Sequence, residues 1–379
     1  MKNKITKRCG IVLTGGGARG AYQVGVLRAL SELSDTKKVA FPVITGVSVG
    51  AINAAALAAN FDDFNYSVQV IENFWKKLHT KNVFDANLMR VILNASRMFL
   101  SEFVPFMKAE SPKSLFQNYP LRQSLEKGID FSKIKQAVST DNLFSVGVTC
   151  SGYSTGNAKT FFETASNTTE WHRERREGMI CDLAIDHVMA SSALPVLFPA
   201  VKIGSEYFGD GSLRLTSPLA PAIHLGGTKL LIVGTRDKIQ ATRVANEMTP
   251  TKYPSIGDIA GYTLDTVFHD SLDADIERLQ RINTTIGLIP ASEIEKTSLK
   301  HITTLVINPS RDLKKIALNY RGEMPRSLRW IVAREGKSEA VGLLESYLLF
   351  EPGYIGTLID LGYKDTMARG EDILEFFRE

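Results

Sequence analysis

The segment that most constrains the fold of this chain is Gly46–Gly50, which reads Gly-Val-Ser-Val-Gly. An apolar, β-branched stretch precedes it at residues 41–45, and a stretch rich in alanine and leucine follows at residues 51–59, so we predict a strand followed by a helix. Ser48 is therefore expected on a sharp strand-to-helix turn, where the flanking glycines leave room for the backbone. Such a serine exposes its hydroxyl at the positive end of a helix, which is typical of a nucleophile elbow.

A glycine-rich loop at Thr14–Gly20 lies between two further predicted elements, an apolar strand at residues 9–13 and an amphipathic helix at residues 21–33. A loop of this kind presents backbone N–H groups with no side chains in front of them, and the following helix adds the positive end of its dipole. The loop is therefore predicted to bind an anion.

Two anions fit this loop. Gly15, Gly17 and Gly20 match the spacing of the dinucleotide fingerprint, but a dinucleotide site also needs an acidic residue at the end of the second strand. Here the second strand leads instead into the turn at Ser48. Because the carboxyl ends of neighbouring parallel strands meet at one edge of a sheet, the loop would lie beside Ser48. We therefore favour the oxyanion that forms during acyl transfer.

A serine nucleophile needs a base that accepts its proton, and the usual base is histidine. An α/β-hydrolase places this histidine after the serine in the chain, which leaves His224, His269 or His301, and none of these lies in a segment rich in glycine. Asp210 is the better candidate, because it stands between two glycines, the second being Gly211, and is predicted to expose its carboxylate on a tight turn.

Residues 61–142 are less regular than the rest, and we predict an insertion there. Apolar residues recur at every third or fourth position over residues 87–103, which predicts a strongly amphipathic helix. Two interpretations are open for it. One is a lid or lipid-facing cap over residues 87–107, and the other, which we favour, is an ordinary helix packed on the core.

The composition bounds the class of protein. A chain of 379 residues that is 44% hydrophobic can bury a large core, and its net charge of +4 is too small to indicate nucleic-acid binding. Cys9, Cys150 and Cys181 have the spacing of neither a disulfide framework nor a metal site, which fits a reducing compartment. No stretch is long enough for a signal-peptide core or a transmembrane helix. We expect a cytoplasmic protein whose membrane contact, if any, is peripheral, for instance through basic residues between positions 311 and 334.

Three segments together resemble the patatin-like phospholipase family. Residues 15–20 (Gly-Gly-Gly-Ala-Arg-Gly) are similar to its glycine-rich oxyanion loop, and Gly46–Gly50 is similar to its nucleophile elbow. Asp210-Gly211 is similar to the Asp-Gly element that supplies the aspartate of a Ser-Asp dyad. The resemblance covers residues 8–234, and it departs from the family at Ser212, where glycine or alanine is usual.

Carried over residue by residue, the resemblance implies that Ser48 is the nucleophile and Asp210 the base, with no histidine. It implies that the backbone N–H groups of Gly15, Gly16 and Gly17 hold the oxyanion.

The resemblance also implies that Arg19 helps to fix this loop, which Gly20 completes. For the whole chain it implies an α/β fold of three layers, α/β/α, with a mainly parallel central sheet. The expected activity is hydrolysis of lipid acyl esters, with no metal and no cofactor. The expected partner is a lipid or ester substrate.

We expect an acyl hydrolase domain at residues 8–240 and a C-terminal α/β extension at residues 241–379 that packs on the same core. The sequence specifies neither the lipid nor the oligomeric state. Two other functions remain open. One is an α/β-hydrolase-type esterase that uses a downstream histidine, and the other is a catalytically silent lipid-binding protein that keeps the pocket.

Overall fold

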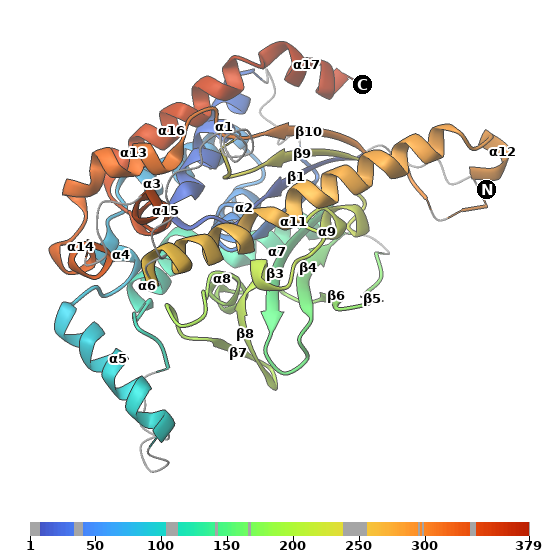
Figure 1. Cartoon of the computed structure of the whole chain (residues 1–379). Coiled ribbons are helices and arrows are strands. Elements are labelled where there is room, and N and C mark those ends of the chain that lie inside the picture. The colour runs from blue at the N-terminus through green and yellow to red at the C-terminus, as the bar shows by residue number, and fades with distance from the viewer. Residues whose placement is uncertain are drawn as a thin grey trace, which may run out of the picture.

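One large sheet organises the molecule (Figure 1). The computed structural model describes residues 8–33, 41–103, 113–140, 143–165, 168–237, 256–294, 296–297, 299–333 and 339–378. The strands run in the order β10-β9-β1-β2-β3-β4-β6-β5, and β8 pairs with both β3 and β7. Their bounds are β1 Cys9–Leu13, β2 Val43–Val47, β3 Ser145–Gly152, β4 Ala158–Thr164, β5 Trp171–Arg173, β6 Arg176–Ile180, β7 Val201–Ile203, β8 Glu206–Asp210, β9 Lys229–Val233 and β10 Thr303–Ile307.

The strands from β10 to β3 along this order are all parallel to their neighbours. Leu13 at the end of β1 is in register with Gly46 near the end of β2. The two loops that follow these strands therefore start side by side at one edge of the sheet, as the sequence predicts. Antiparallel pairs begin at β3, which pairs with β4 and β8.

Alternate residues of the central strands face two different layers of helices. Ile11 and Leu13 belong to a core cluster with α1 and α2, whereas Val12 packs in a second cluster with α9 and α11. The sheet is thus covered on both faces, which is the three-layer α/β/α architecture predicted from the resemblance. The helices are α1 Ala21–Leu33, α2 Val49–Ala59, α3 Phe64–Lys76, α4 Thr80–Val83, α5 Leu88–Phe103, α6 Tyr119–Gly128, α7 Phe131–Ser139, α8 Ile185–Ser191, α9 Ala220–His224, α11 Ile256–Gly287, α12 Ala291–Ile294, α13 Leu313–Tyr320, α14 Arg326–Ala333, α15 Glu339–Leu348, α16 Pro352–Met367 and α17 Gly370–Arg378.

The C-terminal residues contribute to the same sheet and the same core. Strand β10 extends the sheet beside β9 in parallel register. Helix α16 packs along α1, and the two backbones approach closely where each has a glycine: a Cβ on Gly25 would lie 1.9 Å from the Ile359 carbonyl oxygen, and one on Gly362 would lie 2.1 Å from the Tyr22 carbonyl oxygen. The predicted boundary between residues 240 and 241 lies outside the described residues.

The position of helix α5 shows that the interpretation we favoured from the sequence, an ordinary helix packed on the core, is wrong. The helix is not packed along its length on the core but projects from the body of the molecule (Figure 1). Met89 is 76% exposed and Leu93 is 56% exposed, whereas Val91 is buried. Only a narrow strip of this helix therefore faces the protein.

One other expectation needs correction. The turn predicted around Asp210 is instead the end of strand β8. None of the helices in the described part of the chain combines the length and hydropathy that a membrane span requires.

Candidate active site

Ser48 lies at the junction of β2 and α2, as predicted. Its backbone has φ 54° and ψ −127°, a conformation that a residue with a side chain adopts only under strain. The chain can turn here because Gly50 crosses close to β1: a Cβ on Gly50 would lie 2.1 Å from the Leu13 carbonyl oxygen. A Cβ on Gly46 would likewise lie 2.2 Å from the Gly50 carbonyl oxygen. A side chain at position 46 or 50 would therefore clash with the backbone, which explains why both positions of the motif are glycine.

The Ser48 hydroxyl donates a hydrogen bond to Asp210, with 2.6 Å between Oγ and Oδ2. The second oxygen of Asp210, Oδ1, accepts from the backbone N–H of Ser212 at 2.9 Å. The carboxylate is completely buried, so the prediction of an exposed aspartate on a turn is wrong. Strand pairing explains the burial, because β8 lies in the sheet against β3 and Asp210 is in register with Cys150.

Burial also governs the acidity of Asp210. It raises the pKa of the carboxyl from 3.8 to about 6, and the hydrogen bonds from Ser48 and from Ser212 offset only part of this shift. The carboxylate is thus a stronger base than a solvated aspartate would be. Position 212 has a serine where glycine or alanine is usual. This serine fits because Gly15 has no side chain: a Cβ on Gly15 would lie 2.7 Å from Ser212 Oγ.

Two serines that the sequence analysis did not assign to the site hold the backbone of Ser48. The hydroxyl of Ser191 accepts from the Ser48 N–H at 2.9 Å and donates to the Thr149 carbonyl oxygen at 2.7 Å. The hydroxyl of Ser192 donates to the Ser48 carbonyl oxygen at 3.2 Å. Both serines lie within residues 8–234, over which the chain resembles the family, but their contacts depend on the packing of α8 against β3.

The glycine-rich loop lies next to this pair. Gly17 lines the same cavity as Ser48, and it has a φ of 54° in a place where a Cβ would lie 2.4 Å from the Tyr347 carbonyl oxygen. Among the described residues, no acceptor takes the N–H groups of Gly16 or Gly17. The loop is held on its other side by Thr235, whose hydroxyl donates to the Gly15 carbonyl oxygen at 2.6 Å. Among the described residues, the backbone N–H groups of Gly16 and Gly17 therefore remain without an acceptor beside Ser48.

Arg19 binds the C-terminal part of the chain. Its Nε and Nη2 atoms donate to Ser346 Oγ at 2.9 and 2.7 Å, and Nη1 lies 3.8 Å from Asp265 Oδ1. Its guanidinium carbon lies 4.0 Å from the centre of the Tyr347 ring. These contacts tie the glycine-rich loop to the C-terminal part of the chain, and among the described residues Arg19 donates no hydrogen bond to Ser48.

A buried polar network, which the sequence analysis missed, joins the loop to α2 and α3. Asn53 Nδ2 donates to Gln23 Oε1 at 2.9 Å and to the Gly20 carbonyl oxygen at 3.3 Å. Trp75 Nε1 donates to Asn53 Oδ1 at 2.8 Å, and Gln23 Nε2 donates to the Thr14 carbonyl oxygen at 2.8 Å. A fully satisfied buried network of this kind makes its surroundings rigid.

An apolar cavity lies beside Ser48. Its walls come from α2, α3, α4, α6 and the C-terminal helix α15 together with connecting residues. Among the residues that line it are Ile52, Phe74, Trp75, Leu78, Val83, Leu121, Leu194, Phe198, Tyr347, Leu348 and Phe350. An apolar space that ends at a hydrogen-bonded serine suits the hydrocarbon part of a substrate.

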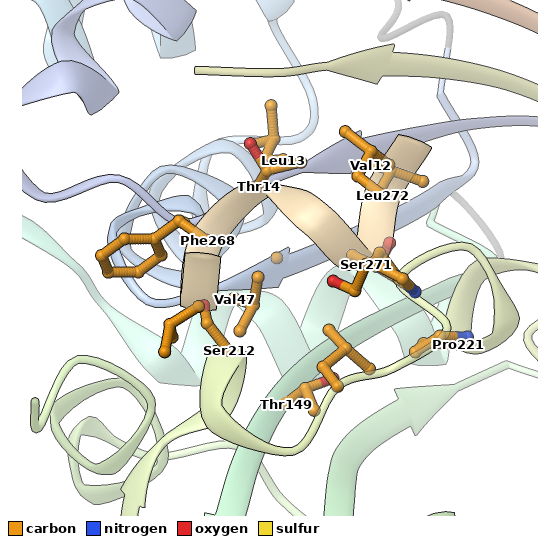
Figure 2. Close-up of a pocket in the computed structure, with 16 residues that line it drawn as sticks. Val12, Leu13, Thr14, Val47, Thr149, Ser212, Pro221, Phe268, Ser271 and Leu272 are labelled. Atoms are coloured by element: carbon orange, nitrogen blue, oxygen red, sulfur yellow. The ribbon is translucent and has the colours of Figure 1, made fainter. Parts of the chain in front are cut away.

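A second cavity lies on the other side of the glycine loop, under α11 (Figure 2). Thr14, Val47, Thr149 and Ser212 line it from the sheet side, and α11 passes over it with Ser271. Its walls are more polar than those of the cavity beside Ser48, and Ser48 does not line this second cavity.

The histidines that an α/β-hydrolase would need lie elsewhere, as far as their side chains are described. His224 stacks on Trp171 with ring centroids 4.7 Å apart, and burial lowers its pKa to about 4. His301 is exposed, and the side chain of His269 lies outside the described residues. Within the described ranges, no cluster of three or more His, Cys, Asp or Glu residues is placed to hold a metal ion.

Two curated proteins are similar to parts of the chain. The chain is 27% identical over 223 residues to a cGAMP-activated phospholipase of Vibrio cholerae, an alignment that covers 56% of each protein. It is 47% identical over 53 residues to the lysophospholipase nte1 of Aspergillus terreus, which covers 14% of this chain and 3% of the relative. The chain thus spans about half of the first relative and a small part of the second.

Solved structures with some likeness include human GIVD cytosolic phospholipase A2 and VipD of Legionella pneumophila. The first has a TM-score of 0.40 at 12% identity, with 100% of this chain and 60% of that chain covered. The second has a TM-score of 0.36 at 12% identity, with 97% and 67% covered. The family model described as patatin-like phospholipase matches residues 11–223, more than half of the chain. The protein therefore belongs to the patatin-like phospholipase family.

Proposed function

We propose that this protein hydrolyses carboxylic ester bonds of lipids through an acyl-Ser48 intermediate. The observation that carries the proposal is the 2.6 Å hydrogen bond from Ser48 Oγ to Asp210 Oδ2, on a strained turn that opens into an apolar cavity. Family membership supports a lipid ester as the substrate. The relatives are named as a phospholipase and a lysophospholipase, so we propose a phospholipid or lysophospholipid.

In the first half of the reaction, Ser48 Oγ attacks the ester carbonyl while its proton passes to Asp210 Oδ2. The negative charge that develops on the carbonyl oxygen is stabilised by the free N–H groups of Gly16 and Gly17. The intermediate collapses to the acyl-enzyme, and Asp210 returns the proton to the leaving alcohol.

In the second half, water attacks the acyl carbon and gives its proton to Asp210. The Ser48–acyl bond then breaks, the carboxylic acid leaves, and Ser48 recovers its proton from Asp210. The acyl chain is held in the apolar cavity between α2, α3 and α15 throughout both halves.

Labelling with a fluorophosphonate probe tests this assignment. Wild type, Ser48→Ala and Asp210→Asn are compared, with circular dichroism to establish that all three are folded. We expect only the wild type to react, because the probe forms a bond with an activated serine. A folded Ser48→Ala protein that still reacts refutes the assignment.

The same labelling experiment, together with histidine variants, vesicle binding and melting-temperature measurements, separates the alternatives. Labelling that survives Asp210→Asn but is lost in His224→Ala, His269→Ala or His301→Ala indicates a histidine-dependent esterase. A wild type that binds lipid vesicles but never reacts indicates a lipid-binding protein without catalytic activity. A shift in melting temperature on adding NAD or FAD would favour the dinucleotide interpretation of the glycine loop.

A further inference from the structure

Helix α5 turns an apolar side to solvent. Ile92, Leu93 and Leu100 lie three, four and eleven residues after Met89, close to whole numbers of helical turns, so the four side chains share one side of the helix. Their exposed fractions are 43%, 56% and 47%, with 76% for Met89. We call Met89, Ile92, Leu93 and Leu100 the α5 apolar face.

The opposite side of α5 makes the contacts with the rest of the molecule. Val91 and Ser101 are buried there, and Asn94 Nδ2 donates to the Leu115 carbonyl oxygen at 3.2 Å. A surface helix normally turns its apolar stripe to the core. Helix α5 packs Val91 against the protein but leaves the four large side chains of the α5 apolar face in solvent, which indicates that this side has another partner.

The base of α5 belongs to the wall of the cavity beside Ser48. Val83, five residues before the helix begins, lines that cavity. The ring of Phe84 contacts Phe116 and Phe198, with centroids 4.6 and 5.6 Å apart, and Phe198 also lines the cavity. A surface that binds α5 is thus held close to the cavity.

Helix α5 carries two basic residues and one acidic residue, Glu102, near its C-terminal end. The basic residues, Arg90 and Arg97, lie seven residues apart on one flank of the apolar face. Arg90 pairs with Asp85 at the start of the helix. An exposed apolar face with a basic flank is typical of helices that lie in the interface of a lipid bilayer that contains anionic lipid.

We infer that the α5 apolar face inserts into the interfacial region of a lipid bilayer and holds the cavity beside Ser48 at the lipid surface. The role in catalysis rests on the proposed function, whereas the binding itself needs no working dyad. A second copy of this chain or another protein is the competing occupant, and the test distinguishes both from a bilayer.

The test compares two exposed leucines in the full-length protein. Leu93→Asp places a charge in the α5 apolar face, and Leu288→Asp places the same charge on a leucine that is 81% exposed beside the far end of α11. Flotation with liposomes of phosphatidylcholine and phosphatidylglycerol measures binding. We expect wild type and Leu288→Asp to bind alike and Leu93→Asp to bind at least tenfold more weakly. Equal binding by the two variants, or no binding by the wild type, overturns the inference.

Light scattering without liposomes examines the competing occupant. A wild-type dimer that becomes a monomer in Leu93→Asp, with no liposome binding by either, assigns the face to a second copy and overturns the inference. An unchanged mass together with the loss of flotation supports it. Both exposed substitutions should leave the melting temperature unchanged.

Two activity measurements separate this inference from the proposed function. Leu93→Asp should hydrolyse a short, water-soluble ester as fast as the wild type but lose most of its activity on phospholipid in liposomes. Ser48→Ala should float with liposomes as the wild type does. A wild type that floats but hydrolyses no ester refutes the proposed function and leaves the binding inference intact.

Discussion

A single carboxylate, Asp210, illustrates how the environment of a residue changes its chemistry. A solvated aspartate has a pKa near 3.8, too low for efficient proton transfer from a serine at neutral pH. Burial at the end of β8 raises this pKa to about 6. Two predictions follow from this value, one for the reaction and one for the stability of the fold.

The rate of ester hydrolysis should depend on the ionisation of Asp210. Only the carboxylate form accepts the Ser48 proton, so kcat/KM for a water-soluble ester should rise with pH and reach half its plateau near pH 6. Initial rates between pH 4.5 and 8.5 measure this profile, with the fold followed by circular dichroism at each pH. A rate that stays flat between pH 5 and 7 would contradict the assignment of Asp210 as the base.

The same pKa shift predicts that Asp210→Asn stabilises the fold at high pH. Because the folded-state pKa of about 6 exceeds the unfolded value of 3.8, the folded protein binds this proton more tightly, and ionisation above pH 6 costs stability. The cost is on the order of 3 kcal/mol. A neutral amide avoids it and can still accept from the Ser212 N–H.

Urea unfolding at pH 8 and at pH 4 measures the difference between wild type and Asp210→Asn. The variant should be the more stable protein at pH 8, and the difference should nearly vanish at pH 4, where both side chains are neutral. Equal unfolding free energies at pH 8 would show that the carboxylate is not destabilising when ionised.

At the scale of elements, the site depends on how helices α1, α2 and α3 hold the glycine-rich loop and the turn at Ser48. Asn53 on α2 bonds to the end of the glycine loop and accepts from Trp75 on α3, all out of contact with water. Removing one member of such a network leaves buried donors without partners.

We therefore expect Asn53→Ala to lower the free energy of unfolding by about 2 to 4 kcal/mol, from the lost hydrogen bonds and the space left behind. Asn60→Ala is the matched control, because Asn60 stands at the end of the same helix and, within the described residues, its side chain bonds only to the Ala56 carbonyl oxygen one turn earlier. Chemical denaturation of both variants makes the comparison. Similar losses in the two proteins would mean that the network adds nothing beyond a local contact.

At the scale of the whole molecule, the C-terminal residues complete the active-site region. They supply strand β10, the Ser346 partner of Arg19, and the cavity residues Tyr347, Leu348 and Phe350. All of these lie beyond residue 223, where the family match ends. We propose that residues 241–379 are an extension that folds only together with residues 8–240.

The contact between α1 and α16 offers a test of this coupling. Alanine is favoured over glycine within a helix by about 1 kcal/mol. At Gly356 a Cβ meets nothing within 4 Å, so Gly356→Ala should stabilise the protein slightly. At Gly362 a Cβ would lie 2.1 Å from the Tyr22 carbonyl oxygen, so Gly362→Ala should destabilise it by about 1 to 3 kcal/mol.

Thermal unfolding of the two alanine variants separates these outcomes, and a single cooperative transition in the wild type is expected for one folding unit. An equal rise in melting temperature for both variants would show that α16 does not pack closely on α1. Two separate transitions would contradict the proposal that the extension folds with the rest.

The sequence by itself determined the parts of the fold that depend on local pattern. The bounds of α1 and of β1 agree with the predicted segments 21–33 and 9–13, because helical periodicity and a short apolar run are local signals. The order of Gly15–Gly20, Gly46–Gly50 and Asp210-Gly211 was sufficient to indicate the family, since each motif depends on backbone geometry that glycine permits.

Only the tertiary structure decided which groups meet and which are buried. The burial of Asp210 depends on its pairing with β3, and the supports from Ser191 and Asn53 come from helices that are distant in sequence. The outward orientation of α5 likewise depends on which of its sides finds a partner. Contacts between segments far apart in the chain leave no periodic signal, and the free energy that fixes them arises only when the whole core is packed.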